Sequence, residues 1–359
     1  MHIRLRTSPV EIGIGSGLLR DLPGFIAGKA PTARVFVITD STVKGLYGRR
    51  LLPDLLNSGI DAWLLDFPPG ERSKNAGVVN TLHTQLLEYE VRRDSLVVAL
   101  GGGVVGDIAG YVAATVLRGI RYLQVPTTLL AQVDSSVGGK VGIDHPLGKN
   151  LIGAFHQPSA VYIDPLVLNT LPDREFRSGL AEVVKIAAGM DLHFFKFLEA
   201  KAHKIINREP KILSEMITRS VQLKAAIVGR DERDSGVRTV LNLGHTIGHA
   251  VETASGYRLR HGEAVAIGLA AESRIARDMG LLATKDLARL LRLMDKLGLP
   301  FTFPRIKNRK TFLSAVGIDK KSSGAGPKFV LLRRIGCSVV GVDVPGPFIE
   351  SLFTHLARS

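Results

Sequence analysis

The sequence predicts an α/β domain with a parallel sheet, followed by a mainly α-helical domain. Short apolar, β-branched runs at residues 33–40, 62–67 and 95–103 alternate with helical patterns, and this alternation is typical of a parallel sheet covered by helices. From about Leu171 onward the pattern changes to longer helical segments. The length of 359 residues also favours two domains over one.

We therefore expect a Rossmann-like α/β domain at residues 1–170 and a helical domain at residues 171–359. The composition, with 45% hydrophobic and 22% charged residues, is that of a globular protein. The single cysteine, Cys337, cannot form an internal disulfide, which favours a reducing compartment. The N-terminus lacks the continuous apolar segment of a signal peptide. We expect a cytoplasmic protein.

The formal net charge of +14 could suit nucleic acid, an anionic membrane or a small acidic substrate. The basic residues are spread along the chain, aromatic residues make up only 6%, and no zinc-finger or RNP motif is present. The most apolar stretch, residues 96–117, contains Asp107 and a glycine run, which indicates a strand, a loop and a helix rather than a membrane span. A small anionic substrate is the expected partner, with neither nucleic acid nor membrane.

Polar loops follow several of the expected strands, at the edge where open parallel sheets bind ligands. The strand at 95–100 runs into the glycines 101–103 and then a helix, an arrangement that lets backbone N–H groups approach a pyrophosphate. A plain tight turn would look the same. Asp40, the PPGERSK loop at 68–74 and the VPTT segment at 125–128 end neighbouring strands. Four such loops favour a dinucleotide.

Three histidines cluster in the helical half. His245 and His249 are spaced i, i+4 on a helix expected from about Arg238 to Gly256, and His261 opens the next helix with Glu263. Thr246 occupies the position where an HExxH protease has its glutamate, which disfavours a protease mechanism. Taken alone, the pair would be interpreted as capping or core histidines.

A carboxylate elsewhere in the helical half favours a metal instead. Glu182 and Lys185 lie i, i+3 on an otherwise apolar helix, where a carboxylate is costly unless it is paired or bound to a cation. Two histidines and one glutamate form a catalytic zinc set that leaves positions open for a ligand.

A further group is basic and polar. Taken singly, such residues are usually solvated surface groups; together with a metal and a dinucleotide they describe a pocket for a small polyanion. The group comprises Asp134, Lys140, Lys149, Asn150, Lys224, Arg238, Asn242, Lys320 and Lys321.

Long motifs in this chain resemble those of the 3-dehydroquinate synthase family, within the sugar-phosphate cyclase superfamily. They are GGGVVGDIAGYVAATVLRGIRYLQVPTT from residue 101, DERDSGVRTVLNLGHTIGHAVE from 231, HGEAVAIG from 261, and the late DKK. The likeness extends from about Asp40 to the C-terminal region. It implies a cytoplasmic, homodimeric lyase of the shikimate pathway, which leads to chorismate and the aromatic amino acids.

The resemblance implies conversion of 3-deoxy-D-arabino-heptulosonate 7-phosphate to 3-dehydroquinate and phosphate, with NAD and a divalent metal, zinc or cobalt. In this family an alcohol is transiently oxidised by NAD, phosphate is β-eliminated, the ketone is reduced again, and an intramolecular aldol reaction closes the ring. The overall reaction involves no net redox change.

The resemblance also assigns residues. The metal ligands are Glu182, His245 and His261, and His249 handles protons near the phosphate site. Arg118 matches a position that the family supplies from the partner subunit. The other substrate and phosphate positions are Lys140, Asn150, Lys185, Lys224, Arg238, Asn242, and Lys320 or Lys321. The NAD positions are Asp40, Glu71, Lys74, Gly102, Gly103, Val104, Asp107, Thr127, Thr128, Asp134, Lys140, Lys149 and Thr170.

One position departs from the family pattern. Members usually have DERE where this chain has DERD, so that Asp234 replaces a glutamate near the site. Three alternatives remain: a related cyclase acting on another sugar phosphate, an iron-type alcohol dehydrogenase, and a non-catalytic NAD- or metal-binding protein. Arg238, Asn242 and His249 favour the carboxylated substrate of the synthase.

Overall fold

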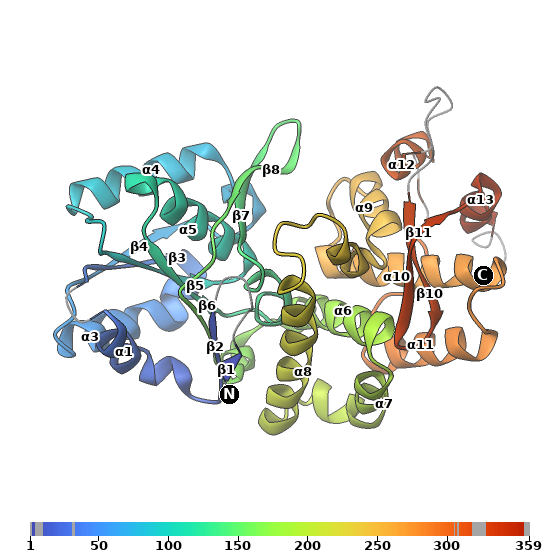
Figure 1. Ribbon diagram of the computed structural model, residues 1–359, viewed down its shortest axis with the longest axis horizontal. Coiled ribbons are helices and arrows are strands. Elements are labelled where there is room, and N and C mark those ends of the chain that lie inside the picture. The colour runs from blue at the N-terminus through green and yellow to red at the C-terminus, as the bar shows by residue number, and fades with distance from the viewer. Residues whose placement is uncertain are drawn as a thin grey trace. The chain divides into compact units, whose positions relative to one another are not determined.

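The computed structural model describes residues 2–3, 10–30, 33–304, 306, 309–317 and 328–354. They form two compact units (Figure 1). The first contains the described residues up to Leu171 together with Val228–Arg233, and the second contains the described residues from Pro172 onward apart from that segment. The α/β first unit and the mainly helical second unit confirm the expected fold class.

A seven-stranded sheet forms the first unit, in the order β1-β2-β9-β6-β5-β3-β4. The edge pair β1–β2 is antiparallel, and the other neighbours pair in parallel. In this order the strands are β1 (His2–Ile3), β2 (Glu11–Ile14), β9 (Ala160–Ile163), β6 (Arg121–Pro126), β5 (Leu96–Gly101), β3 (Val35–Asp40) and β4 (Ala62–Phe67).

The central strands are buried on both faces, which explains their near-continuous apolar sequences. Every residue of β5 is buried. Val97 and Ala99 pack on the face covered by α4 (Ala76–Glu88) and α5 (Gly103–Thr115), whereas Val98 packs on the face covered by α1 (Leu18–Lys29) and α3 (Arg49–Asn57). This two-sided core fixes the strand ends and the loops that follow them.

A separate hairpin, β7 (Lys140–His145) and β8 (Gly148–Phe155), carries further candidate site residues. Val141 and Ile143 of β7 belong to the core on the α5 side of the main sheet. The remaining short elements of this unit are α2 (Ser41–Val43), η1 (Lys44–Gly48), η2 (Glu71–Ser73), η3 (Val116–Arg118), η4 (Ala131–Ser135) and η5 (Pro165–Thr170).

Helices dominate the second unit (Figure 1). They are α6 (Asp173–Met190), α7 (Leu192–Ile206), α8 (Pro210–Val228), η6 (Val237–Asn242), α9 (His245–Ala254), α10 (His261–Asp278), α11 (Thr284–Lys296), α12 (Arg309–Val316) and α13 (Gly346–Thr354). Two strands that the sequence pattern did not indicate, β10 (Lys328–Arg334) and β11 (Cys337–Asp343), form an antiparallel pair.

The helix expected from Arg238 to Gly256 was predicted wrongly as one segment. A 3₁₀ turn ends at Asn242, Gly244 adopts a left-handed conformation with φ of 78°, and α9 begins only at His245. Gly256 does follow the C-terminus of α9 with φ of 64°, as expected of a C′ glycine. None of the helices in the described part of the chain combines the length and apolarity that a membrane crossing needs.

Candidate functional site

Three helices of the second unit bring Glu182, His245 and His261 together. Glu182 lies in the middle of α6, while His245 and His261 are the first residues of α9 and α10. The Glu182 Oε1 atom is 3.7 Å from His245 Nε2 and 3.4 Å from His261 Nε2. Ligands about 2.0–2.2 Å from a tetrahedral zinc ion are separated by roughly 3.3–3.6 Å. One distance lies within this range and the other exceeds it by about 0.1 Å, so the spacing is close to that of ligands around a divalent metal.

The other ring nitrogen of each histidine faces a group that orients the ring. His245 Nδ1 donates to the Leu243 carbonyl oxygen at 3.2 Å, and His261 Nδ1 lies 3.7 Å from Glu252 Oε2. Partners of this kind fix the tautomer and direct the opposite nitrogen toward a metal. Both Nε2 atoms thus point to the same side as Glu182.

The charges at this site suit metal ligation. Burial opposes ionisation of Glu182, but Lys185, whose Nζ lies 2.5 Å from Oε2, together with His261 and His245 holds the pKa of Glu182 well below its usual range. Burial and the Lys185 ammonium lower the pKa of His245. Against burial, Glu182 and Glu252 raise the pKa of His261 to about 9. A cation bound here would replace the proton on His261.

Glu182 also provides the test of fit. The side chain is fully buried. Its Oε2 atom pairs with Lys185, and its Oε1 atom faces the Nε2 atoms of His245 and His261. Lys185 offsets part of the cost of burying this carboxylate, and a metal cation bound on the Oε1 side would offset more of it. His249, Glu252 and His261 are also close enough to hold an ion, but His249 is exposed, so we favour the set built on Glu182.

Glycines allow the three helices to approach closely enough for their ligands to meet. A Cβ on Gly262 would lie 1.9 Å from the Ser178 carbonyl oxygen in α6, and one on Gly268 would lie 2.0 Å from the Gly244 carbonyl oxygen. In both cases the obstacle is backbone, which cannot rotate away as a side chain can. These contacts fix the spacing of α6, α9 and α10.

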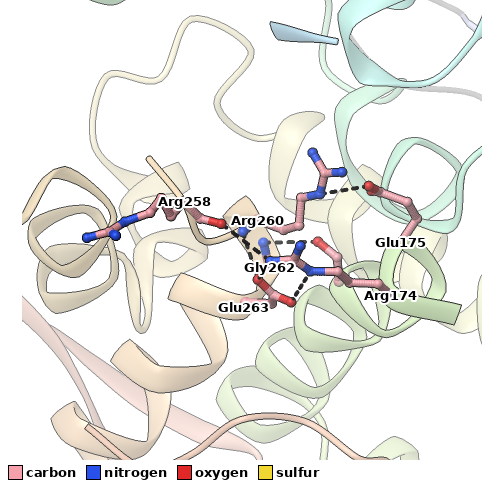
Figure 2. A network of polar contacts seen from close by, with 7 residues as sticks. Arg174, Glu175, Arg258, Arg260, Gly262 and Glu263 are labelled. Carbon is pink, nitrogen blue, oxygen red and sulfur yellow. Dashed lines mark hydrogen bonds and ion pairs between the residues drawn. The ribbon is translucent and has the colours of Figure 1, made fainter. Parts of the chain in front are cut away.

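Figure 2 shows a polar network around the first turn of α10, where His261 lies. The guanidinium of Arg174 donates to both carboxylate oxygens of Glu263, at 2.7 and 2.8 Å. Glu263 in turn accepts from the backbone N–H of Arg260 at 2.8 Å, and the Arg260 side chain pairs with Glu175 at 2.9 Å. The network joins α6 to the start of α10 and so supports the position of His261.

In the first unit, the GGG segment forms the start of α5, as the sequence indicates. Gly102 is the N-cap residue and offers no capping side chain, so the first backbone N–H groups of α5 are available to an anion. A Cβ on Gly102 would lie 3.0 Å from Thr128, and one on Gly101 would lie 2.4 Å from Val105. A side chain at either position would therefore crowd its neighbours, and the glycines keep the start of α5 compact.

Lys74 connects several of the predicted residues in the first unit. Its Nζ lies 2.6 Å from Asp107 Oδ2 and donates to Asn150 Oδ1. Burial raises the pKa of Asp107 to about 6, against the opposing effect of Lys74. The backbone N–H of Asn150, which adopts φ of 56°, donates to Asp144. The structure therefore places one predicted phosphate residue beside two predicted NAD residues.

Asp40 and Thr170 have local partners as well. Asp40 Oδ1 accepts from the backbone N–H groups of Thr42 and Val43 and caps α2. Thr170 Oγ1 forms a hydrogen bond with the hydroxyl of Tyr47 and donates to the Val167 carbonyl.

The predicted site residues of the first unit differ in their exposure to solvent. Lys74 and Thr127 are buried; Asp40, Gly102, Gly103, Val104, Asp107, Thr128 and Asp134 are half-buried; and Glu71, Arg118, Lys140, Lys149, Asn150 and Thr170 are exposed. Leu117 and Arg118 are consecutive residues with positive φ angles, 50° for Leu117 and 68° for Arg118.

The predicted substrate residues of the second unit are divided in the same way. Lys185, Lys224 and Arg238 are buried, whereas Asn242, His249 and Asp234 are exposed. Asp234 adopts a left-handed conformation with φ of 58°. Lys320 and Lys321 lie outside the described residues.

Sequence reasoning missed two buried carboxylates near the metal ligands, Glu252 and Glu272. Each interrupts an apolar helical pattern, in HAVET and GLAAES. That signal had identified Glu182, and it could have identified both of these residues.

Solved structures with the same fold show what this architecture is used for. A 2-epi-5-epi-valiolone synthase from Streptomyces hygroscopicus subsp. jinggangensis, solved with NAD+ and Zn2+ bound, matches with a TM-score of 0.89 and 30% identity, and the match covers 99% of both chains. A 2-deoxy-scyllo-inosose synthase, solved with carbaglucose-6-phosphate, NAD+ and Co2+, matches with a TM-score of 0.89 and 25% identity over 99% of both chains. Fold and site together define a cyclase of this type.

Sequence comparison shows to which family of synthases the chain belongs. Models of the 3-dehydroquinate synthase N-terminal and C-terminal regions match residues 64–178 and 179–322. A 3-dehydroquinate synthase from Nitrosospira multiformis is 44% identical, over 98% of this chain and 97% of its own, and one from Pelobacter propionicus is 46% identical over 95% of both. The chain belongs to the 3-dehydroquinate synthase family.

Proposed function

We propose that this chain converts 3-deoxy-D-arabino-heptulosonate 7-phosphate to 3-dehydroquinate and inorganic phosphate. The family assignment supports this reaction. Within the structure, the observation that carries it is the fully buried carboxylate of Glu182, whose Oε1 atom faces the Nε2 atoms of His245 and His261. These three residues would hold the divalent metal, zinc or cobalt.

NAD, when bound, supplies a hydride acceptor that is regenerated in each turnover, and the metal supplies a Lewis acid for adjacent substrate hydroxyls. The start of α5, with Gly102 and Gly103, would hold the pyrophosphate of NAD on backbone N–H groups. Asp40 and the Lys74–Asp107 pair would complete the NAD site. The NAD-binding domain then corresponds to residues 1–170.

The chain's own residues would bind and orient an anionic substrate. Lys224 and Arg238, both buried, would pair with the substrate carboxylate, assisted by Asn242. Lys140 and Asn150 would contact the phosphate, with Lys320 or Lys321. His249, exposed beside the two ligand histidines, would exchange the proton that accompanies phosphate release. Residues 171–359 would form the metal- and substrate-binding domain.

We further propose that the active form is a homodimer in the cytoplasm. Arg118 is exposed and lies in η3, the short segment that follows α5, and an exposed arginine is accessible to a neighbouring subunit. Mixing Arg118→Ala with His249→Ala subunits tests this idea. Heterodimers should regain activity if Arg118 acts across the interface, and demonstrated subunit exchange without recovery would contradict it.

A phosphate-release assay with the heptulosonate phosphate, in the presence and absence of a chelator, tests the reaction. Activity should be lost on chelation and restored by zinc or cobalt, and catalytic amounts of NAD should support many turnovers. Full activity in a demonstrably metal-free sample would exclude the metal site. Stoichiometric accumulation of NADH at 340 nm would instead favour a dehydrogenase.

A dehydrogenase is the second candidate because the fold is shared. An iron-containing alcohol dehydrogenase from Thermococcus thioreducens matches with a TM-score of 0.67, but at 17% identity this likeness shows the fold alone.

A further inference from the structure

Glu272 is a fully buried carboxylate in the interior of α10, and the proposed chemistry does not use it. Within the described part of the chain no cationic side chain pairs with it. Its two oxygens accept hydrogen bonds from a different helix instead. The backbone N–H of Gly244 donates to Oε2 at 2.7 Å, and that of Ile247 donates to Oε1 at 2.9 Å.

These donors belong to the first turn of α9. The first N–H groups of a helix have no partners within the helix and are normally capped by the side chain of the N-cap residue. Here the N-cap is Gly244, which has no side chain. Glu272 therefore acts as the N-terminal cap of α9, although it belongs to the neighbouring helix α10. An N-cap side chain would normally accept these hydrogen bonds.

The crossing leaves no room for a local cap. Gly244 adopts φ of 78°, and a Cβ at this position would lie 2.9 Å from the backbone nitrogen of Leu269. A serine or aspartate at position 244 would therefore meet both backbone strain and the backbone of α10. The cap has to come from α10 itself.

His245 lies between the two residues whose N–H groups Glu272 holds. Its ring is oriented by the Leu243 carbonyl just before the helix begins. A shift of the first turn would consequently move both the His245 side chain and the carbonyl that fixes its tautomer. The carboxylate thus holds the backbone from which this ligand projects.

We propose that Glu272 is a positioning residue for the metal site, which fixes the first turn of α9 and so directs His245 Nε2 toward Glu182. The inference rests on the proposed role of His245 as a ligand. Glutamine at position 272 would keep one acceptor and turn an NH₂ group toward a backbone N–H. Residues that orient metal ligands typically account for 10–100-fold in metal affinity.

The experiment compares zinc affinity, measured by competition with a chromophoric chelator, and the visible spectrum of the cobalt-loaded protein. The Glu272→Gln variant should bind zinc at least tenfold more weakly and show an altered cobalt spectrum. Ser273→Ala is the matched control, since Ser273 is equally buried in the same helix but hydrogen-bonds within it, to the Leu269 carbonyl. This control should keep the zinc affinity within about twofold of the wild type.

A second variant covers the case in which Glu272→Gln does not fold. Glu272→Asp keeps the carboxyl group but withdraws it by roughly 1.3 Å, and it should show an intermediate loss of zinc affinity. A folded variant of either kind with wild-type affinity and an unchanged cobalt spectrum would overturn the proposal. If neither variant folds, Glu272 serves folding and the positioning role is rejected.

A separate measurement tests whether His245 is a metal ligand. The single substitution His245→Ala should abolish tight zinc binding. If His245→Ala binds zinc as tightly as the wild type, the ligand set itself is wrong, and the proposed metal site fails rather than the inference about Glu272 alone.

Discussion

The two units build their candidate sites in different ways. In the first, the site is a row of loops at the ends of parallel strands, and each loop is shaped by residues adjacent in sequence, such as Gly101 and Gly102. In the second, Glu182, His245 and His261 come from three helices whose spacing depends on contacts between distant residues. The strand-end loops of the first unit are thus encoded mainly by local sequence, whereas the ligand set of the second unit depends on tertiary packing.

Replacing one glycine by alanine in each unit tests this difference. The loss of stability should be larger in the second unit. A Cβ at Gly268 would meet the backbone of Gly244 at 2.0 Å, whereas one at Gly106 in α5 would meet the end of the Gln124 side chain at 2.7 Å. We expect Gly268→Ala to destabilise its unit by about 3 kcal/mol or more, and Gly106→Ala by about 1 kcal/mol, because only the side chain can move aside. Hydrogen exchange of each unit measures both effects.

Gly24→Ala provides the control for these two variants. Gly24 lies in the interior of α1, and a Cβ added there would have no neighbour within 4 Å, so alanine should stabilise by about 0.5–1 kcal/mol. Equal losses from Gly268→Ala and Gly106→Ala would contradict the contrast between backbone and side-chain neighbours.

Removing the charge beside His261 is the next largest perturbation. Glu252→Gln takes away the carboxylate that faces Nδ1 at 3.7 Å, and we expect zinc affinity to fall about 10- to 100-fold. Isothermal titration with zinc, at a pH where the wild type is saturated, measures the change. The start of α5 lies in the other unit, so NAD affinity should be unaffected; a parallel loss of NAD binding would indicate general misfolding.

We expect a smaller effect from the ionisation of Asp107, which should make the stability of the first unit depend on pH. Because burial raises the pKa of Asp107 to about 6, the native state binds this proton more tightly than the unfolded chain, where aspartate titrates near ~3.9. The contribution of Asp107 to stability is therefore complete below about pH 4 and is lost as the pH rises through 6.

The comparison to make is wild type against Asp107→Asn. The free energy of unfolding of the wild type should fall more steeply between about pH 4 and 6.5 than that of the variant. Urea titrations followed by Trp63 fluorescence report on the first unit, because this is the only tryptophan in the sequence and it lies in β4. Parallel pH profiles would contradict the raised pKa.

The smallest effect is expected at Asp234. Aspartate tolerates the left-handed conformation, φ of 58°, better than most residues, and glutamate there would extend the carboxylate by roughly 1.3 Å. We expect Asp234→Glu to keep kcat/KM within about tenfold, which corresponds to about 1.4 kcal/mol. Asp234→Ala should lose more because it removes the carboxylate. Equal, small effects at equal metal occupancy would mean that Asp234 is only a solvated charge.

The sequence could predict most of the first unit because its signals are local. Runs of β-branched residues became β3 and β5, and the glycines became the start of α5. Periodicity also placed Glu182 and the histidines on helices. It could not show the break at Gly244, because that glycine is required by the backbone of α10 and not by its neighbours in sequence.

The roles of the supporting residues of the second unit were hidden for the same reason. Glu252 and Glu272 act on residues whose positions become clear only once α9 and α10 cross. In the first unit, the contact from Lys74 to Asn150 depends on the packing of the β7–β8 hairpin, which no local pattern specifies. The roles of these residues therefore required the tertiary structure.

The backbone contact between Gly268 and Gly244 also bears on which ions the site can select. Where helices meet through side chains, a ligand set can expand or contract as rotamers change; where they meet through backbone, the separation of the ligands is nearly fixed. Zinc and cobalt accept nitrogen ligands at similar short distances, whereas calcium requires oxygen ligands at about 2.3–2.6 Å. The contact between Gly268 and Gly244 would therefore help to hold the two histidine ligands at a separation that suits these smaller ions.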